Sequence, residues 1–183
     1  MRIIGGTAKG HTIKAPKGVD TRPTLDRVRE SVFNVLSNRG IFGTHVLDIF
    51  SGTGAVAIEA LSRGAAHAVA VDFKTGRLIL ENAKHCHVED RLEIIPRKLS
   101  QLKNYIMGQQ FDYIFSDPPY ENGFIQETID MVVDCDLLKP DGVLLLEHHK
   151  DEAFTLPESW KCIKEQKFGY TMVSYFVNTA ERS

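Results

Sequence analysis

The sequence lacks the features of a membrane-spanning, secreted or disulfide-stabilised protein. No apolar run approaches the roughly 20 residues that a membrane helix needs, and residues 1–6 lack the apolar stretch of a signal peptide. The cysteines Cys86, Cys135 and Cys162 are far apart and odd in number, which excludes a disulfide framework. These absences predict a cytoplasmic protein with no membrane partner.

The composition that remains is that of an ordinary globular domain. Of the 183 residues, 43% are hydrophobic and 25% are charged, which is typical of folded proteins and not of disordered chains. A chain of this length buries about 70% of its unfolded surface, so it forms a full core without metals or disulfides. We expect one domain with a small extension, in a monomer.

The net charge of −2 conceals an asymmetry along the chain. Residues 1–40 carry eight Lys and Arg residues against three acids, a net charge of +5, which leaves −7 for residues 41–183. A basic arm on an acidic body favours a polyanionic partner for the arm, and nucleic acid is the leading candidate. We therefore divide the chain into a basic extension (1–40) and a main domain (41–183).

Strands and helices alternate along the main domain. Short apolar runs predict strands at 46–50, 67–72, 92–95, 111–115 and 142–147, and the segments 54–63, 74–85, 98–107 and 123–133 between them are typical of helices. The extension predicts a small hairpin (2–4 with 12–14) and a helix over 24–38 capped by Thr24. Residues 162–166 and 171–177 predict a final hairpin. The fold class is therefore α/β: a Rossmann-like, doubly wound, mostly parallel seven-stranded sheet with a C-terminal antiparallel hairpin.

A glycine-rich turn follows the first of these strands. Gly52 and Gly54 with Ala57 fit the pattern G-x-G-x-x-A, in which glycines let a ligand approach the backbone at a helix N-terminus. Asp48 lies beside them, where its carboxylate would repel the pyrophosphate of a dinucleotide. It suits an ammonium group, such as the methionine end of S-adenosylmethionine. Asp72 ends the second strand, where a carboxylate can accept hydrogen bonds from both ribose hydroxyls.

The fourth strand ends at the turn Asp117-Pro118-Pro119-Tyr120. Prolines fix the backbone and donate no hydrogen bond, so the Asp117 side chain and the Pro118 carbonyl can both accept from one substrate NH2 group. The exocyclic amine of guanine or adenine is such a group, and two acceptors can orient its lone pair. Tyr120 can stack on an extruded base, an interaction of roughly 1–3 kcal/mol.

These motifs resemble those of amino-methylating class I S-adenosylmethionine-dependent methyltransferases. More narrowly, the chain resembles the RsmD family, which methylates guanine N2 in small-subunit 16S ribosomal RNA. The resemblance covers nearly the whole chain and includes the segments Arg2-Ile3-Ile4-Gly5-Gly6, Arg22-Pro23-Thr24 and Leu61-Ser62-Arg63-Gly64-Ala65, besides the glycine-rich and Asp-Pro-Pro-Tyr turns. It implies as partner the small-subunit RNA or the assembled small ribosomal subunit.

The resemblance also implies roles for individual residues. Catalytic residues would be Asp117, Pro118 and Tyr120. The cofactor would contact Asp48, Ser51, Gly52, Thr53, Gly54, Asp72, Phe73 and Asp117. The RNA-facing residues would be Arg2, Lys9, Arg22, Arg27 and Arg29. The chain departs from the family's wider class at 96–100, where many enzymes place an acid or amide for the adenine amino group and this sequence has none.

Other activities remain open at this stage. A DNA adenine or protein glutamine amino-methyltransferase can use the same four-residue turn, and an RNA-binding assembly factor can retain a vestigial pocket. Asp48 disfavours a nicotinamide-dependent dehydrogenase. His85, Cys86 and His87 are adjacent, but i and i+2 positions of a helix point to nearly opposite faces, so we predict no metal site.

Overall fold

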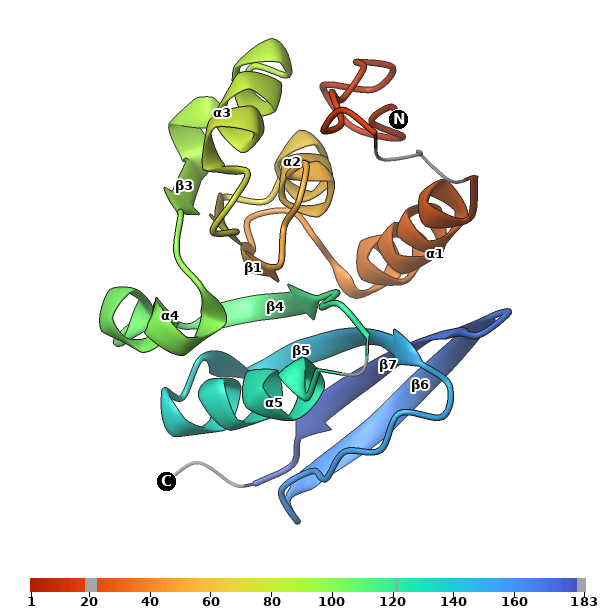
Figure 1. The fold of residues 1–183 in the computed structure, drawn as a ribbon, viewed down its shortest axis with the longest axis vertical. Coiled ribbons are helices and arrows are strands. Elements are labelled where there is room, and N and C mark those ends of the chain that lie inside the picture. Colours follow the sequence, from red (N-terminus) through yellow and green to blue (C-terminus); the bar gives the residue numbers. More distant parts are fainter. Residues whose placement is uncertain (19–22, 121, 181–183) are drawn as a thin grey trace.

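The computed structural model describes residues 1–18, 23–120 and 122–180. Its centre is a seven-stranded sheet in the order β3-β2-β1-β4-β5-β7-β6 (Figure 1). The strands are β1 (His45–Ile49), β2 (His67–Val71), β3 (Leu92–Ile95), β4 (Phe111–Ser116), β5 (Leu138–His149), β6 (Trp160–Phe168) and β7 (Thr171–Asn178). Strands β1 to β5 are parallel, and β7 lies antiparallel between β5 and β6. The predicted fold class is confirmed.

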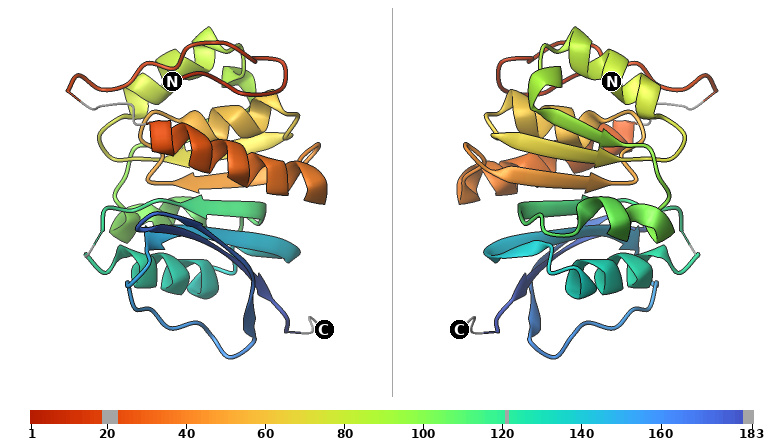
Figure 2. Two further views of the ribbon diagram at one scale, coloured as in Figure 1. Left: turned by 90° about the vertical axis from the view of Figure 1, so that its right-hand side faces the viewer. Right: turned by 90° about the vertical axis from the view of Figure 1, so that its left-hand side faces the viewer.

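Helices cover both faces of this sheet. They are α1 (Pro23–Arg39), α2 (Ala55–Ser62), α3 (Gly76–His85), α4 (Leu99–Ile106) and α5 (Phe124–Asp134), with a short 3₁₀ turn at Glu89–Arg91. Figure 2 shows α1 across one face and α4 and α5 across the other. Buried side chains form one apolar cluster on the side of α1, α2 and α3 and a second on the side of α4 and α5. Consecutive strand residues alternate between these two clusters, as a sheet covered on both faces requires.

The basic extension packs onto the same core as the main domain. Arg2 and Thr12 form an isolated antiparallel bridge, so the predicted hairpin is present in its shortest form. Ile3 and Ile13 are buried in the cluster that contains α1 and α2. The division of the chain at residue 40 therefore stays a prediction, because both parts contribute to one core.

Two predicted element boundaries are wrong. The first helix begins at Pro23, which places Thr24 inside the helix and not at its cap; proline is favoured at a first helical position because its missing N–H would be unpaired there. Strand β5 begins at Leu138 and not at Gly142. The register between β4 and β5 shifts between Phe111 and Tyr113, and such an irregularity accommodates Pro140 and Gly142 in the first part of β5.

Candidate active site

The glycine-rich turn joins β1 to α2 through left-handed backbone conformations. Phe50 has φ 60°, Gly52 has φ 59° and Gly54 has φ 82°. Gly54 is the N-cap of α2, and a Cβ atom there would lie 3.0 Å from the side chain of Ile79. Gly52 has open space where its Cβ would be. Glycine is thus favoured at 54 by its positive φ and by close packing, and at 52 it leaves the backbone accessible from the cavity.

Asp48 is a buried carboxylate at the base of this turn, with 1% of its surface exposed. Its Oδ2 accepts hydrogen bonds from the Ser51 hydroxyl (2.6 Å) and the Ala57 backbone N–H (3.2 Å). Burial raises the pKa of Asp48 to about 7, although these two hydrogen bonds favour the ionised form. The side chain both fixes the turn and keeps a titratable group next to a ligand cavity.

Asp72 organises the turn that follows β2. Its Oδ2 accepts a hydrogen bond from the Gly52 N–H (3.0 Å), and its Oδ1 accepts from the N–H groups of Lys74 (2.9 Å) and Thr75 (3.2 Å). A carboxylate has about four acceptor positions, so one remains for a ligand hydroxyl. Phe73, which is 49% exposed, lies next to it with the ammonium groups of Lys74 and Lys98 over its ring.

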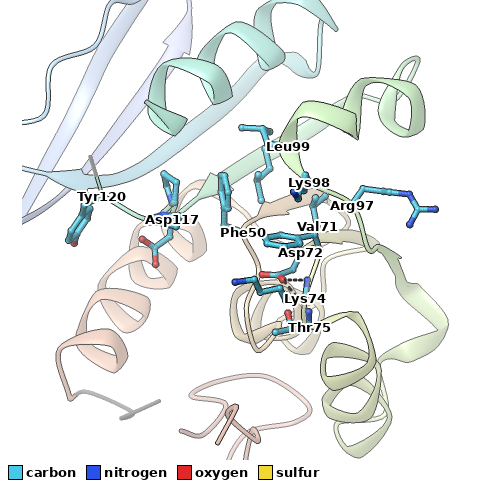
Figure 3. Close-up of a pocket in the computed structure, with 14 residues that line it drawn as sticks. Phe50, Val71, Asp72, Lys74, Thr75, Arg97, Lys98, Leu99, Asp117 and Tyr120 are labelled. Atoms are coloured by element: carbon cyan, nitrogen blue, oxygen red, sulfur yellow. Dashed lines mark hydrogen bonds between the residues drawn. The ribbon is translucent and has the colours of Figure 1, made fainter. Parts of the chain in front are cut away.

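A cavity of about 460 Å³ lies at the carboxyl ends of the parallel strands, where open α/β sheets bind ligands. Figure 3 shows Asp117 and Tyr120 at one end, Arg97 at the other and Phe50 between them. The walls also include Asp72, Phe73, Lys98 and Leu99. This volume and mixed lining suit a nucleoside-sized ligand. Segment 96–100, which has no acid or amide for the adenine amino group, contributes Arg97, Lys98 and Leu99 to the wall of this cavity.

A second cavity, of about 210 Å³, lies beneath the N-terminal half of α1. Its upper wall is formed by side chains of α1, including Leu25, Val28 and Val32. Its floor contains three carboxyl groups, those of Asp48, Asp117 and Glu147. Burial raises the pKa of Asp117 to about 7 and that of Glu147 to about 8, and the two groups also disfavour each other's ionisation. Asp117 lines both cavities and therefore marks their junction.

The Asp-Pro-Pro-Tyr turn begins a series of aromatic side chains. Tyr120 is 43% exposed, and its hydroxyl is 2.9 Å from that of Thr171. The edge of Tyr120 meets His149, with 6.0 Å between ring centroids, and His149 is stacked on Tyr170 at an interplanar angle of 7°. Tyr170 is 72% exposed, which extends this aromatic series from the cavity onto the protein surface.

The residues predicted to face RNA divide into two groups. Arg2, Lys9 and Arg27 are exposed, whereas Arg22 lies outside the described residues. Arg29 was wrongly placed on the surface: its side chain is 5% exposed, donates to the Arg2 carbonyl oxygen and lies 3.6 Å from the Glu59 carboxylate. Its spacing from Val28 and Val32 left it beside the apolar stripe, and packing of the extension onto α2 buried it.

Two features of the site were not recognised from the sequence. Glu147 comes after an apolar run near the carboxyl end of its strand, close to the positions of Asp48 in β1 and Asp117 just after β4, and this common position was the available signal. Tyr170 is the second, since it is 72% exposed and continues the aromatic series that begins at Tyr120. Its place in the turn of the predicted hairpin was the available signal, since turns lie on the protein surface.

The described residues contain neither a metal-binding cluster nor a membrane-spanning helix. In residues 1–18, 23–120 and 122–180, no group of three His, Cys, Asp or Glu side chains is arranged to hold a metal ion. Among the same residues, no helix is both long and apolar enough to cross a bilayer.

Comparison with known proteins agrees with this architecture. The family model described as Conserved hypothetical protein 95 matches residues 1–177. Ribosomal RNA small subunit methyltransferase D of Haemophilus influenzae is 32% identical, covering 96% of this chain and 91% of its own. The protein of that name from Escherichia coli K12 is 30% identical, covering 99% and 91%. The solved structure of Escherichia coli yhhF superimposes with a TM-score of 0.87 at 29% identity and covers 99% of each chain.

The sheet order, the glycine-rich turn and the Asp-Pro-Pro-Tyr turn define a class I methyltransferase, an enzyme class whose methyl donor is S-adenosylmethionine. Within that class, the chain belongs to the Conserved hypothetical protein 95 family, the RsmD family. The resemblance seen in the motifs is thereby confirmed.

The residues present fit S-adenosylmethionine. The open space at Gly52 admits a ligand to the backbone, and the carboxyl of Asp48 can face a cationic ligand. The half-exposed ring of Phe73 offers a flat apolar surface to a nucleobase, and Asp72 retains acceptor capacity for a ribose.

Proposed function

We propose that this chain transfers a methyl group from S-adenosylmethionine to the exocyclic N2 amine of a guanine in small-subunit ribosomal RNA. The observation that carries the proposal is the position of Asp117. It lies at the junction of a nucleoside-sized cavity and a second cavity with an acidic floor. The relatives named for small-subunit ribosomal RNA support the substrate class.

The cofactor would lie along the carboxyl ends of β1 and β2. Asp72 would hold its ribose, Phe73 would cover one face of its adenine, and Ser51, Gly52, Thr53 and Gly54 would surround its methionine part. Asp48 would face the ammonium group. When bound, S-adenosylmethionine supplies the methyl group as an activated sulfonium substituent, so no nucleophilic protein side chain is needed.

Asp117 and Pro118 would position the acceptor amine. The lone pair of a nucleobase amine is delocalised into the ring and is a poor nucleophile. If the Asp117 carboxylate and the Pro118 carbonyl each accept one N–H, the lone pair is directed at the methyl group. Tyr120 would stack on the base, and Asp117 or water would take the proton that the amine loses.

Transfer of labelled methyl from S-adenosylmethionine tests this proposal. Unmethylated small ribosomal subunits, naked small-subunit RNA, duplex DNA and a protein extract are offered in parallel, and the modified base is identified. Label on guanine N2 of the small-subunit RNA is expected. Label on DNA adenine or protein glutamine would show that the substrate proposed here is wrong. Cofactor binding without any methyl transfer would favour an RNA-binding assembly factor.

Replacing Phe73 by alanine is expected to weaken S-adenosylmethionine binding roughly 5- to 100-fold, because stacking of a base on an aromatic ring contributes about 1–3 kcal/mol. Calorimetric titration with the cofactor measures the effect. Phe42→Ala is the matched control, since Phe42 is 87% exposed and precedes β1, at the amino ends of the parallel strands and away from the cavity. Equal affinities of the two variants would remove Phe73 from the binding site.

Reversing the exposed charges of the extension is expected to weaken RNA binding. In the triple variant Arg2→Glu, Lys9→Glu and Arg27→Glu, the slope of log affinity against log salt should become shallower by up to about three, one per lost phosphate contact. A matched variant reverses Lys161, Lys164 and Lys167, which are exposed on β6. If the β6 variant changes the slope and the extension variant does not, the RNA contacts β6 instead.

A further inference from the structure

Glu147 is a buried carboxyl group that the scheme above does not use. Only 5% of its surface is exposed, and within the part of the chain that the structure describes its carboxylate accepts no hydrogen bond. Its oxygens are not among the fully buried atoms that lack a partner, so the carboxylate is accessible from a cavity. A largely buried carboxyl group that faces a cavity is a candidate for a functional role. Here the group lines the cavity beneath α1.

The sheet register places Glu147 next to Asp117. Ser116 of β4 pairs with Leu146 of β5, so the residue that follows each of them lies at the same level of the sheet. Leu145, two residues before Glu147, belongs to the apolar cluster that contains α1, as does Phe115, two residues before Asp117. Both carboxyl groups therefore project from neighbouring strands toward the same helix.

The charged groups around Glu147 leave it available to a ligand. From β1, Asp48 is held by Ser51 and Ala57. From α1, Arg29 lines the same cavity but is paired with Asp26 (3.4 Å) and Glu59 (3.6 Å). From β7, the residue opposite Glu147 is the apolar Val173. Beside the part lined by Ser51, Gly52 and Thr53, where the methionine part of the cofactor would lie, the cavity has an apolar roof from α1 and the carboxyl groups of Asp117 and Glu147 at its floor. This part suits a flat ligand with N–H donors along one edge.

We propose that Glu147 binds the ring N1–H of the target guanine while Asp117 and Pro118 hold the adjacent N2 amine. This inference rests on the proposed function, and it names Glu147 as a residue that determines base specificity. On the Watson–Crick edge of guanine, N1–H and the N2 amine are neighbouring hydrogen-bond donors. The carboxyl groups of Glu147 and Asp117 lie on neighbouring strands and can accept from these two donors side by side. Adenine and 2-aminopurine present an unprotonated N1 instead, and this lone pair would face the carboxylate of Glu147.

The test compares guanine with 2-aminopurine at the methylated position. Both bases carry the 2-amine, but 2-aminopurine lacks the N1 hydrogen. Once the wild-type enzyme has identified the nucleotide, RNA carrying each base there is assayed for kcat/KM at a pH above the raised pKa of Glu147, where its carboxyl is ionised. The wild type should prefer guanine by roughly 10- to 100-fold, which lies within the range of a good contact to a base edge.

The variant Glu147→Gln should reduce that preference by at least about tenfold, because an amide can donate to an unprotonated N1. Comparing the two ratios cancels the different intrinsic reactivities of the two bases. Glu165→Gln, an exposed position on β6, should keep the wild-type preference. Calorimetry should give cofactor affinities within a few-fold of wild type for both variants, and the amide is close enough in shape to preserve the fold.

The outcomes separate this inference from the proposed function. An active Glu147→Gln enzyme with an unchanged preference would overturn the role of Glu147 alone. Loss of cofactor binding in that variant would show that Glu147 binds the methyl donor, and this result would also overturn its role in base recognition. Wild-type enzyme that places no methyl group on guanine N2 would overturn the proposed function and this inference together.

Discussion

Replacing Asp117 by alanine is expected to lower kcat/KM for methyl transfer by about 10²–10³-fold or more, while cofactor affinity changes by no more than a few-fold. Removing one preorganised hydrogen-bonding group from a catalytic site typically costs about this much. In this site Asp117 would be both an acceptor for the amine and an acceptor for its proton, so its loss affects the reaction more than binding. Single-turnover transfer assays and calorimetry measure the two quantities separately.

Asp141→Ala is the control for this prediction, because Asp141 is exposed near the start of β5, away from the cavities. It should keep wild-type transfer. A second variant, Asp117→Asn, keeps the side-chain volume and one acceptor, so it should retain more activity than the alanine variant. If Asp117→Ala instead loses the cofactor, Asp117 belongs to the cofactor pocket and the assignment of the acceptor site is wrong.

Replacing Glu59 by alanine is expected to destabilise the fold by about 3–5 kcal/mol, the usual loss when one partner of a buried ion pair is removed. Glu59 is fully buried on α2 and accepts hydrogen bonds from the backbone N–H groups of Ile4 (3.0 Å) and Gly5 (2.9 Å). It also binds Arg63 (2.9 Å) and pairs with Arg29. Its removal leaves the buried Arg29 without its principal counter-charge and releases the N-terminal segment from α2.

Urea denaturation measures this loss, and Glu81→Ala is the matched control. Glu81 also forms an ion pair within a helix, but its side chain is 47% exposed and that of its partner Arg77 is 94% exposed. Exposed pairs of this kind contribute only about 0.3–0.5 kcal/mol. If Glu59→Ala unfolds at the same urea concentration as Glu81→Ala, the extension is not anchored by this cluster.

Many local features could be predicted because they depend on neighbours in sequence. The apolar runs of β1 to β4, the helices between them and the terminal hairpin follow from hydrophobic periodicity. The turns at Gly52 and Asp117 follow from residue types with restricted or permissive backbones. The order of the strands was not predicted, since β1 pairs not only with the next strand β2 but also with β4, whose paired residues lie more than 60 positions further along the chain.

Other features depended on packing between distant segments. Arginine is a residue type usually found at the surface. Arg29 is buried only because residues 1–13 pack onto α2. Tyr170 is an aromatic residue of a type often found in cores. It lies at the tip of the β6–β7 hairpin instead, where it is exposed and stacks on His149. Burial is a property of the assembled chain, so residue type alone misassigns both.

The sequence by itself determined the class of fold, the family and the two turns that hold the chemistry, because each depends on a local pattern of residues. The tertiary structure decided which side chains share a cavity. Asp48, Asp117 and Glu147 are separated by 69 and 30 residues along the chain, and only the parallel register of β1, β4 and β5 brings their carboxyl groups together under α1. The pKa of each group is raised by that burial and proximity, which no local pattern encodes.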